Sequence, residues 1–517
     1  MKKDIYNNSR TKNTIKNMQT GLVTQFVNKL LAFVVRTVFI KMLSTEYLGI
    51  NGLFTNILTM LSFAELGIGN AIIFSMYKPV ANDDKEKIKS LVQLYKTSYL
   101  LIGTFIFFIG ICIIPFLQFL INDMPNIKES IIVIYLLFLI DTTLSYFFSY
   151  KRSVIFAYQK ENIINNYTTY MYILKAVLEI VFLIFTKNFV IYLLIQIICT
   201  FTLNIIISNK SNKMFPYLKE KNITKLSISE SKSIYKNVKS LVIYKFGAVV
   251  LNGTDNILMS SMFNINLVGL CSNYTLITES VKTVIKSLLN GFKSSVGNLN
   301  ATSTKEKKEE IFYQLFFVCF WVYAFCCTSI LILINPFIKI WLGESYILEL
   351  PIVWSLILIM FIDGLRYIGI VYRETLGLFE KGKFSPFMAA ILNIVLSIVF
   401  GKLLGIAGIF LATSIANLLT LVWVDPYLIH KYEFGTSSKK YFKRFLIYLF
   451  VFICNYAIVF SISNFIPDTG IVNFIIKCIL VFVISNLFIY IIFRNTVEYK
   501  ELKKKIFEYM KRKKINL

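Results

Sequence analysis

Charged side chains that interrupt long apolar runs are the residues of this sequence that could do chemistry. Arg36 lies inside the first run, and Glu65 lies near the middle of the second. A charge at bilayer depth is costly, and it usually marks a functional site that faces the protein interior. The ligand-binding candidates are Arg36, Lys175, Lys282, Lys286 and Arg366, and the coupling or gating candidates are Glu65, Glu179, Asp255, Glu279 and Asp363.

The spacing of these charges places several of them on shared helix faces. Glu279, Lys282 and Lys286 are three, four and seven residues apart, which is the spacing of one face. Such a polar stripe cannot face lipid, so we expect these faces to line a shared, water-filled interior. Because cations prevail there, the expected ligand is an anion, and arginine offers a bidentate fork for phosphate.

The same spacing also allows purely structural ion pairs. Lys175 and Glu179 are four residues apart, and Asp363 and Arg366 are three apart, so each pair could neutralise itself. Along the sequence, Arg36, Lys282 and Lys286 are not matched by an equal number of close acidic residues, which favours a ligand role for these three cations. Glu65 could bind a coupling cation or pair with Arg36, and the sequence leaves both interpretations open.

The elements that must position these residues are membrane-spanning helices. The chain has 517 residues, of which 56% are hydrophobic and 16% charged, against roughly 25% charged residues in soluble domains. We therefore predict an all-α polytopic membrane protein with about fourteen spans. Their limits are 20–43, 49–77, 91–120, 129–150, 163–186, 188–208, 238–263, 267–289, 312–336, 350–372, 384–401, 405–429, 444–465 and 471–493.

The net charge of +26 is explained by basic loops on one side of these spans. Every second loop is rich in Lys and Arg, including the loop with Lys151, Arg152 and Lys160 and the loop Arg373–Lys383. The positive-inside rule then predicts a plasma-membrane protein with both termini in the cytoplasm, and nucleic acid is not an expected partner.

A weak internal repeat predicts two lobes. The segments around Leu48-Gly49 and Val268-Gly269 align, with a charge in the preceding helix (Arg36; Asp255) and a glycine opening the next. We predict two six-helix lobes around a V-shaped central cavity, followed by two extra helices. The predicted parts are an N-terminal lobe (1–208), a cytoplasmic linker (209–237), a C-terminal lobe (238–430), spans 13 and 14 (431–493) and a basic tail (494–517).

Several kinds of chemistry find no support in the sequence. The eight cysteines lie in apolar runs without metal-ligand spacing, and His430 is the single histidine, so no metal site is expected. No GxxxxGK[ST] phosphate loop occurs. We expect no cofactor and no enzymatic activity, and transport would be driven by an ion gradient or the membrane potential.

The N-terminal motifs are similar to those of a known family. The segments are Arg36–Lys41 (RTVFIK), Glu46–Phe54 (EYLGINGLF), Ala64–Gly69 (AELGIG) and Tyr77–Pro79 (YKP), within about the first hundred residues. They resemble the N-terminal signature of Wzx-type polysaccharide flippases of the multidrug/oligosaccharidyl-lipid/polysaccharide exporter (MOP) superfamily.

The resemblance implies translocation of an undecaprenyl-diphosphate-linked oligosaccharide by alternating access, for capsule, exopolysaccharide or cell-wall assembly. It also implies that Arg36 binds the diphosphate, whereas the equivalent place in span 7 holds Asp255, so Lys282 and Lys286 are the second-lobe candidates. Expected partners are this lipid-linked glycan, membrane lipids, and a polysaccharide polymerase with its export machinery. The alternatives are a cation-coupled multidrug exporter, which would favour interior carboxylates, and a membrane glycan polymerase, which would need a larger outer loop.

Overall fold

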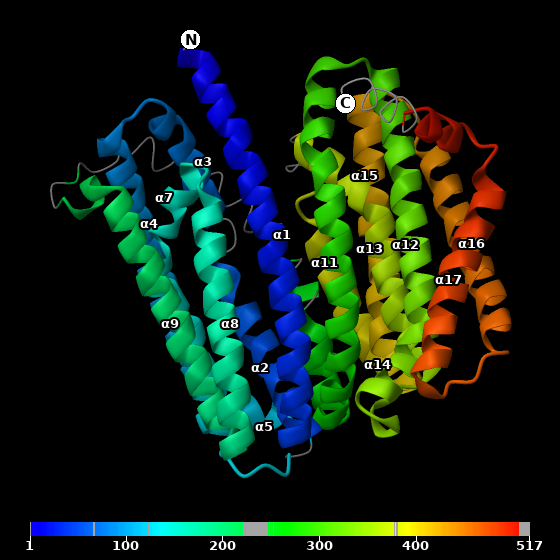
Figure 1. Cartoon of the computed structure of the whole chain (residues 1–517), viewed down its shortest axis with the longest axis horizontal. Coiled ribbons are helices and arrows are strands. Elements are labelled where there is room, and N and C mark those ends of the chain that lie inside the picture. Colours follow the sequence, from blue (N-terminus) through cyan, green and yellow to red (C-terminus); the bar gives the residue numbers. More distant parts are fainter. Residues whose placement is uncertain are drawn as a thin grey trace. The chain divides into compact units, whose positions relative to one another are not determined.

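The computed structural model describes residues 2–65, 68–122, 125–220, 223, 247, 249–251, 253–376, 378 and 381–505, and all regular elements in these ranges are helical (Figure 1). Ten helices in these ranges are long and apolar enough to cross a membrane. In lipid, a helix satisfies its backbone hydrogen bonds within one segment, which explains why these apolar runs fold in this way. The prediction of an all-α, multi-pass membrane protein is confirmed.

The chain forms two compact units, Met1–Ser272 and Asn273–Leu517, whose boundary falls inside helix α11 (Ile265–Thr302). Most of the predicted linker 209–237 lies outside the described residues, as does the second half of the basic tail, 506–517. The predicted domain limits therefore stay a prediction.

In the N-terminal unit, α1 packs against α8, and α9 packs against both α6 and α8. The elements are α1 (Lys2–Met42), α2 (Thr45–Leu61), η1 (Ser62–Glu65), α3 (Ile68–Ala81), α4 (Lys85–Ile113), η2 (Ile114–Phe116), α5 (Leu117–Leu120), α6 (Ile131–Ser149), α7 (Arg152–Ala157), α8 (Glu161–Thr186), α9 (Phe189–Met214) and η3 (Pro216–Lys219). Residues 253–262 are helical and lead toward α11.

The predicted second span, 49–77, is wrong as a continuous α-helix. The α-helix α2 ends at Leu61, and the 3₁₀ turn η1 follows and ends on Glu65. The Ser62 hydroxyl donates to the Leu58 carbonyl at 2.8 Å, a serine back-bond that often bends helices. A 3₁₀ stretch inside a helical span often marks a functional hinge or a strained sequence, and this one ends on a carboxylate.

The two glycines that the repeat pairs occupy equivalent places in a helix crossing. A Cβ on Gly49 would lie 2.0 Å from the Ile265 carbonyl oxygen, and one on Gly269 would lie 2.2 Å from the Thr45 oxygen. Each glycine is the fifth residue of its helix and meets the first residue of the other helix. Only glycine permits so close an approach of two backbones.

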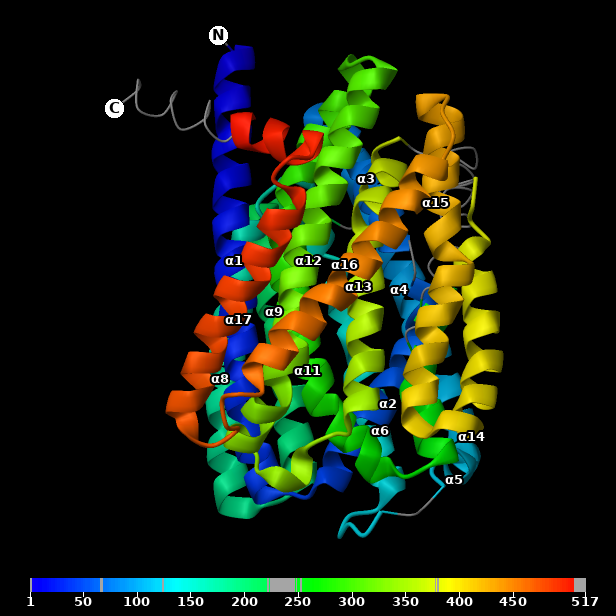
Figure 2. The ribbon, with the colours of Figure 1, turned by 90° about the vertical axis from the view of Figure 1, so that its right-hand side faces the viewer.

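In the C-terminal unit, α12 packs against α13, α16 and α17 (Figure 2). The elements after α11 are α12 (Lys305–Trp341), η4 (Glu344–Tyr346), α13 (Leu350–Thr375), α14 (Ser385–Leu419), α15 (Leu421–Ile429), η5 (His430–Phe434, a π-helical turn), α16 (Lys439–Ser463) and α17 (Gly470–Phe493). The segment α14 is two helices joined at Gly405 (φ 66°, ψ −147°). The predicted spans 384–401 and 405–429 meet at this turn.

Aromatic rings and one amide attach the last two helices to this unit. The ring centroids of Phe320 and Tyr448 lie 4.2 Å apart, and those of Phe361 and Phe452 lie 4.2 Å apart. The buried Asn455 amide donates to Thr328 at 2.9 Å and to Ser485 at 2.8 Å, which links α16 to α12 and α17.

Candidate functional site

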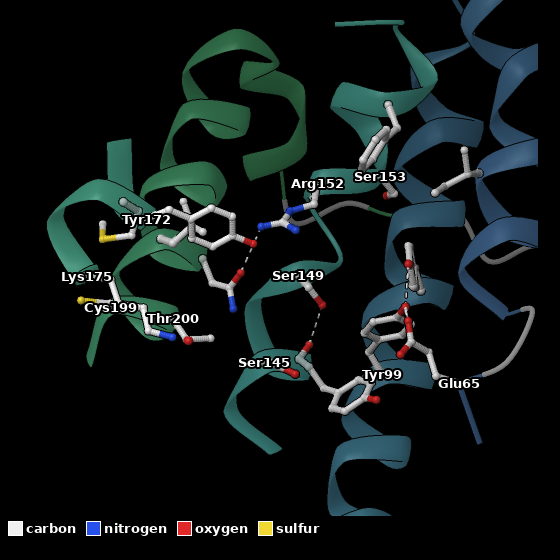
Figure 3. Close-up of a pocket in the computed structure, with 17 residues that line it drawn as sticks. Glu65, Tyr99, Ser145, Ser149, Arg152, Ser153, Tyr172, Lys175, Cys199 and Thr200 are labelled. Atoms are coloured by element: carbon white, nitrogen blue, oxygen red, sulfur yellow. Dashed lines mark hydrogen bonds between the residues drawn. The ribbon is translucent and has the colours of Figure 1, made fainter. Parts of the chain in front are cut away.

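A cavity of about 420 Å³ lies inside the N-terminal unit (Figure 3). Its walls come from η1, α3, α4, α6, α7, α8 and α9. The chain therefore assembles this site from segments spread over more than a hundred residues. It contains two of the predicted site residues, Glu65 and Lys175.

The acidic side of the cavity is formed by Glu65 and two tyrosines. The Tyr99 hydroxyl donates to Glu65, and the Tyr95 hydroxyl donates to Tyr99 at 2.8 Å. These tyrosines are four residues apart on α4 and so share a face. A Cβ at Gly69 would lie 2.5 Å from the Tyr95 hydroxyl, so this glycine leaves room for the hydroxyl pair. Among the described residues, the carboxylate thus accepts a hydrogen bond from the Tyr99 phenol and makes no ion pair with a cation.

The basic side is formed by Arg152, the first residue of α7. Its Nη2 donates to Asn204 Oδ1 at 3.5 Å, and its Nε has no hydrogen-bond partner among the described residues. Burial lowers the pKa of the Arg152 guanidinium, and the nearby Tyr172, Tyr95 and Tyr99 partly offset this effect. The group nevertheless stays protonated at neutral pH. It offers several N–H donors to a ligand.

Sequence reasoning missed Arg152 because it treated this residue as an ordinary basic residue of an inner loop. A usable signal existed, since Ser145, Ser149 and Ser153 recur every four residues and form one polar stripe that reaches Arg152. All three serines line the cavity (Figure 3).

Lys175 belongs to a partly buried polar network at the opposite side of the view from Glu65 (Figure 3). Its Nζ lies 3.4 Å from Glu179 and donates to Gln196 at 3.2 Å. Gln196 in turn donates to Asp141 at 2.9 Å. The pair predicted from i,i+4 spacing therefore forms, and it recruits two further residues from α6 and α9.

Arg36 does not line this cavity. Its Nη1 donates to the Ser272 hydroxyl at 2.7 Å, at the contact of α1 with the start of α11. Asp255 is half-buried in the helical residues 253–262. In this structure Glu65 is bound by Tyr99.

The C-terminal unit gathers four of the predicted charges into one cluster. Lys282 Nζ lies 2.7 Å from Glu279 Oε1 and 3.2 Å from Asp363 Oδ2, and Arg366 Nη1 lies 3.7 Å from Asp363 Oδ1. Lys282 thus has two acidic neighbours, one of them from α13, which counting along the sequence could not find. Lys286 is exposed one turn further along α11.

The predicted shared interior stays a prediction. Arg36 and Lys175 belong to the N-terminal unit, whereas Lys282, Lys286 and Arg366 belong to the C-terminal unit. Within the described ranges, no group of three or more His, Cys, Asp or Glu side chains could hold a metal ion.

The fold is similar to the folds of solved membrane transporters. The chain is similar to the lipid II flippase MurJ in its inward closed conformation, with a TM-score of 0.62 and 15% identity over 92% of this chain and 99% of that one. It is also similar to an inward-facing MATE-family multidrug resistance transporter of the MOP superfamily, with a TM-score of 0.60 and 15% identity over 76% of this chain and 91% of that one. The chain has the fold of these membrane transporters.

A mutant of the Vibrio cholerae MATE transporter VcmN matches with a TM-score of 0.50 and 15% identity, over 82% of this chain and 98% of that one. No protein-family model and no curated protein sequence matches the chain. At such low identity these similarities concern the fold, and the site must be interpreted from its own residues.

Proposed function

We propose that this protein is a flippase that moves an undecaprenyl-diphosphate-linked oligosaccharide from the inner to the outer leaflet. The observation that carries the proposal is the placement of basic side chains on apolar helices, namely Arg36, Lys175, Lys282 and Arg366. Charges at such depth are retained where they serve a ligand or a pathway. The fold shared with a lipid II flippase over nearly the whole chain supports the same conclusion.

In this proposal Arg36 binds the diphosphate. Its guanidinium is already positioned by the Ser272 hydroxyl, and a planar fork matches two phosphate oxygens. Lys282 would exchange one carboxylate partner for phosphate during transport. The exposed Lys286 would contact the sugar-phosphate before Lys282 does. The protein would work in the plasma membrane with both termini in the cytoplasm, alongside a glycan polymerase and export machinery.

The test is a deletion strain complemented with wild-type or Arg36→Ala protein, in which lipid-linked oligosaccharide is measured on each face of the membrane. We expect completed units to accumulate on the inner leaflet, with rescue by wild type and at least about tenfold weaker rescue by Arg36→Ala, because charge-assisted hydrogen bonds to phosphate are lost. Arg494→Ala, at an exposed arginine after α17, is the matched control. Normal export by Arg36→Ala at wild-type abundance would contradict the assignment.

One observation favours a second candidate, a cation-coupled multidrug exporter. Glu65 lies among tyrosine rings in the N-terminal cavity, and a carboxylate beside aromatic rings is suited to an organic cation. Efflux of cationic dyes by cells that express the protein, together with unchanged pools of lipid-linked glycan, would select this function instead.

A further inference from the structure

The N-terminal cavity contains two opposite charges that do not neutralise each other. Within the described part of the chain, neither Glu65 nor Arg152 makes an ion pair, although both line the same cavity. Glu65 is bound by Tyr99 and Arg152 by Asn204. Both side chains are half-buried and present their charged groups to the cavity, so an occupant that carries both charges would find a counter-charge at each end.

The two charges have separate hydrogen-bond partners. Tyr99 donates to Glu65 and Tyr95 donates to Tyr99, whereas Arg152 donates to Asn204. In Figure 3, Glu65 and Tyr99 lie on one side of the cavity, and Arg152 lies nearer Tyr172. An occupant that satisfies both ends must therefore carry its own two charges some distance apart.

Other residues that line the cavity are polar or aromatic. Ser145, Ser149 and Asn204 offer hydroxyl and amide groups, and the Tyr172 ring offers an apolar face. This combination suits a ring that carries several hydroxyls. Lys175 contributes less to anion binding than Arg152, because Glu179 already lies 3.4 Å from its ammonium group.

We propose that this cavity binds a phosphorylated sugar that carries a free amine, with the phosphate on Arg152, the ammonium group on Glu65 and the hydroxyls on the serines and Asn204. The volume of about 420 Å³ falls in the range of small-molecule sites. Arginine binds phosphate oxygens through paired N–H donors, and a carboxylate beside tyrosine rings binds ammonium groups. This inference does not depend on the proposed transport function.

The first test is a binding series on the purified full-length protein in detergent. The probes are glucosamine 6-phosphate, glucose 6-phosphate, glucosamine and N-acetylglucosamine 6-phosphate, and affinity is measured by isothermal titration. We expect glucosamine 6-phosphate to bind at least about tenfold more tightly than the other three, because each of these lacks one charge or has it blocked. Equal binding of glucosamine 6-phosphate and glucose 6-phosphate, or no binding of either, would overturn the proposal.

Two isosteric variants assign the ends of the ligand. Glu65→Gln keeps an oxygen that can accept from Tyr99, and it should abolish the preference for the free amine while glucose 6-phosphate binding stays unchanged. Arg152→Gln should remove binding of both phosphates by at least about tenfold. Asp83→Asn and Lys160→Gln, at exposed positions of the same unit, should leave all affinities unchanged. An unchanged amine preference in a well-folded Glu65→Gln protein would refute the role of Glu65.

A third arm separates two sources of the same chemistry, a soluble sugar phosphate and a lipid headgroup. The glucosamine 6-phosphate titration is repeated in nanodiscs of phosphatidylglycerol alone and in nanodiscs that also contain phosphatidylethanolamine, whose headgroup carries a phosphate and an amine. Weaker binding in the second set would support the site and identify a lipid headgroup as its occupant. Equal binding in both sets would support the site and identify a sugar ligand.

Discussion

Replacement of either partner of the Arg373–Asp425 ion pair should strongly destabilise the C-terminal unit. The pair joins the last turn of α13 to α15 at 2.5 Å, and the side chains are only 2% and 3% exposed. Removing one partner of such a pair leaves a buried charge uncompensated, which costs about 3–5 kcal/mol. We therefore expect Arg373→Met and Asp425→Leu each to lower the folding equilibrium constant by roughly two to nearly four powers of ten.

The double replacement distinguishes this cause from simple loss of packing. Arg373→Met combined with Asp425→Leu removes both charges of the pair, so it should recover most of the stability lost in either single variant. The assay is equilibrium unfolding of the purified protein in mixed micelles, followed by circular dichroism.

The exposed pair Lys339–Glu344 is the matched control, because it has the same 2.5 Å separation with side chains 35% and 74% exposed. Exposed pairs contribute little, so Lys339→Met should hardly change the unfolding midpoint. Lys339 lowers the pKa of the Glu344 carboxyl. The small contribution of this ion pair to stability is therefore complete above pH 4.5, the ordinary pKa of the group, and is lost as the pH falls through its lowered pKa. A double variant no more stable than the single variants, or equal effects at the buried and exposed pairs, would refute the reasoning.

Further predictions concern glycines and a buried amide, all measured by the same unfolding assay. Gly49→Ala and Gly269→Ala should each lower the free energy of unfolding by about 1–3 kcal/mol, because the new methyl would meet a backbone oxygen at 2.0 or 2.2 Å. Gly297→Ala is the control and should be neutral or stabilising, since the nearest atom to its new methyl would lie 3.7 Å away. Gly405→Ala should cost about 1–3 kcal/mol, since φ 66° with ψ −147° is accessible almost only to glycine; an unchanged midpoint would contradict the turn. Asn455→Ala should cost about 1–3 kcal/mol through loss of its two hydrogen bonds, and no loss would show that the amide does not hold α16 in place.

Apolar run length and loop charge were enough to predict the membrane fold. The predicted limits of the α8, α9, α13 and α17 spans agree with the structure to within a few residues, apart from the C-terminal extension of α9. This accuracy has a simple cause, because a helix in lipid is specified locally by length and hydropathy. The glycine motifs around Gly49 and Gly269 were also visible in the sequence, although their mutual contact was not.

The sequence could not predict which basic residues are buried. Arg152 and Arg373 both looked like ordinary cytoplasmic loop cations, yet Arg373 is buried against Asp425, and Arg152 lines the N-terminal cavity. Along the chain Lys282 had only Glu279 as a close acidic neighbour, and Asp363 reaches it from a helix about eighty residues away. These pairings depend on which helix faces meet, and hydropathy does not encode that choice.

The sequence by itself determined an all-helical membrane protein with charges set into its spans, because helix length and the cost of a charge in lipid are local properties. The tertiary structure alone decided where those charges find partners. It broke the second span at Glu65, placed that carboxylate in one cavity with Arg152, and paired Lys282 with Asp363, because contacts between helices far apart in the chain follow from packing rather than from spacing along it.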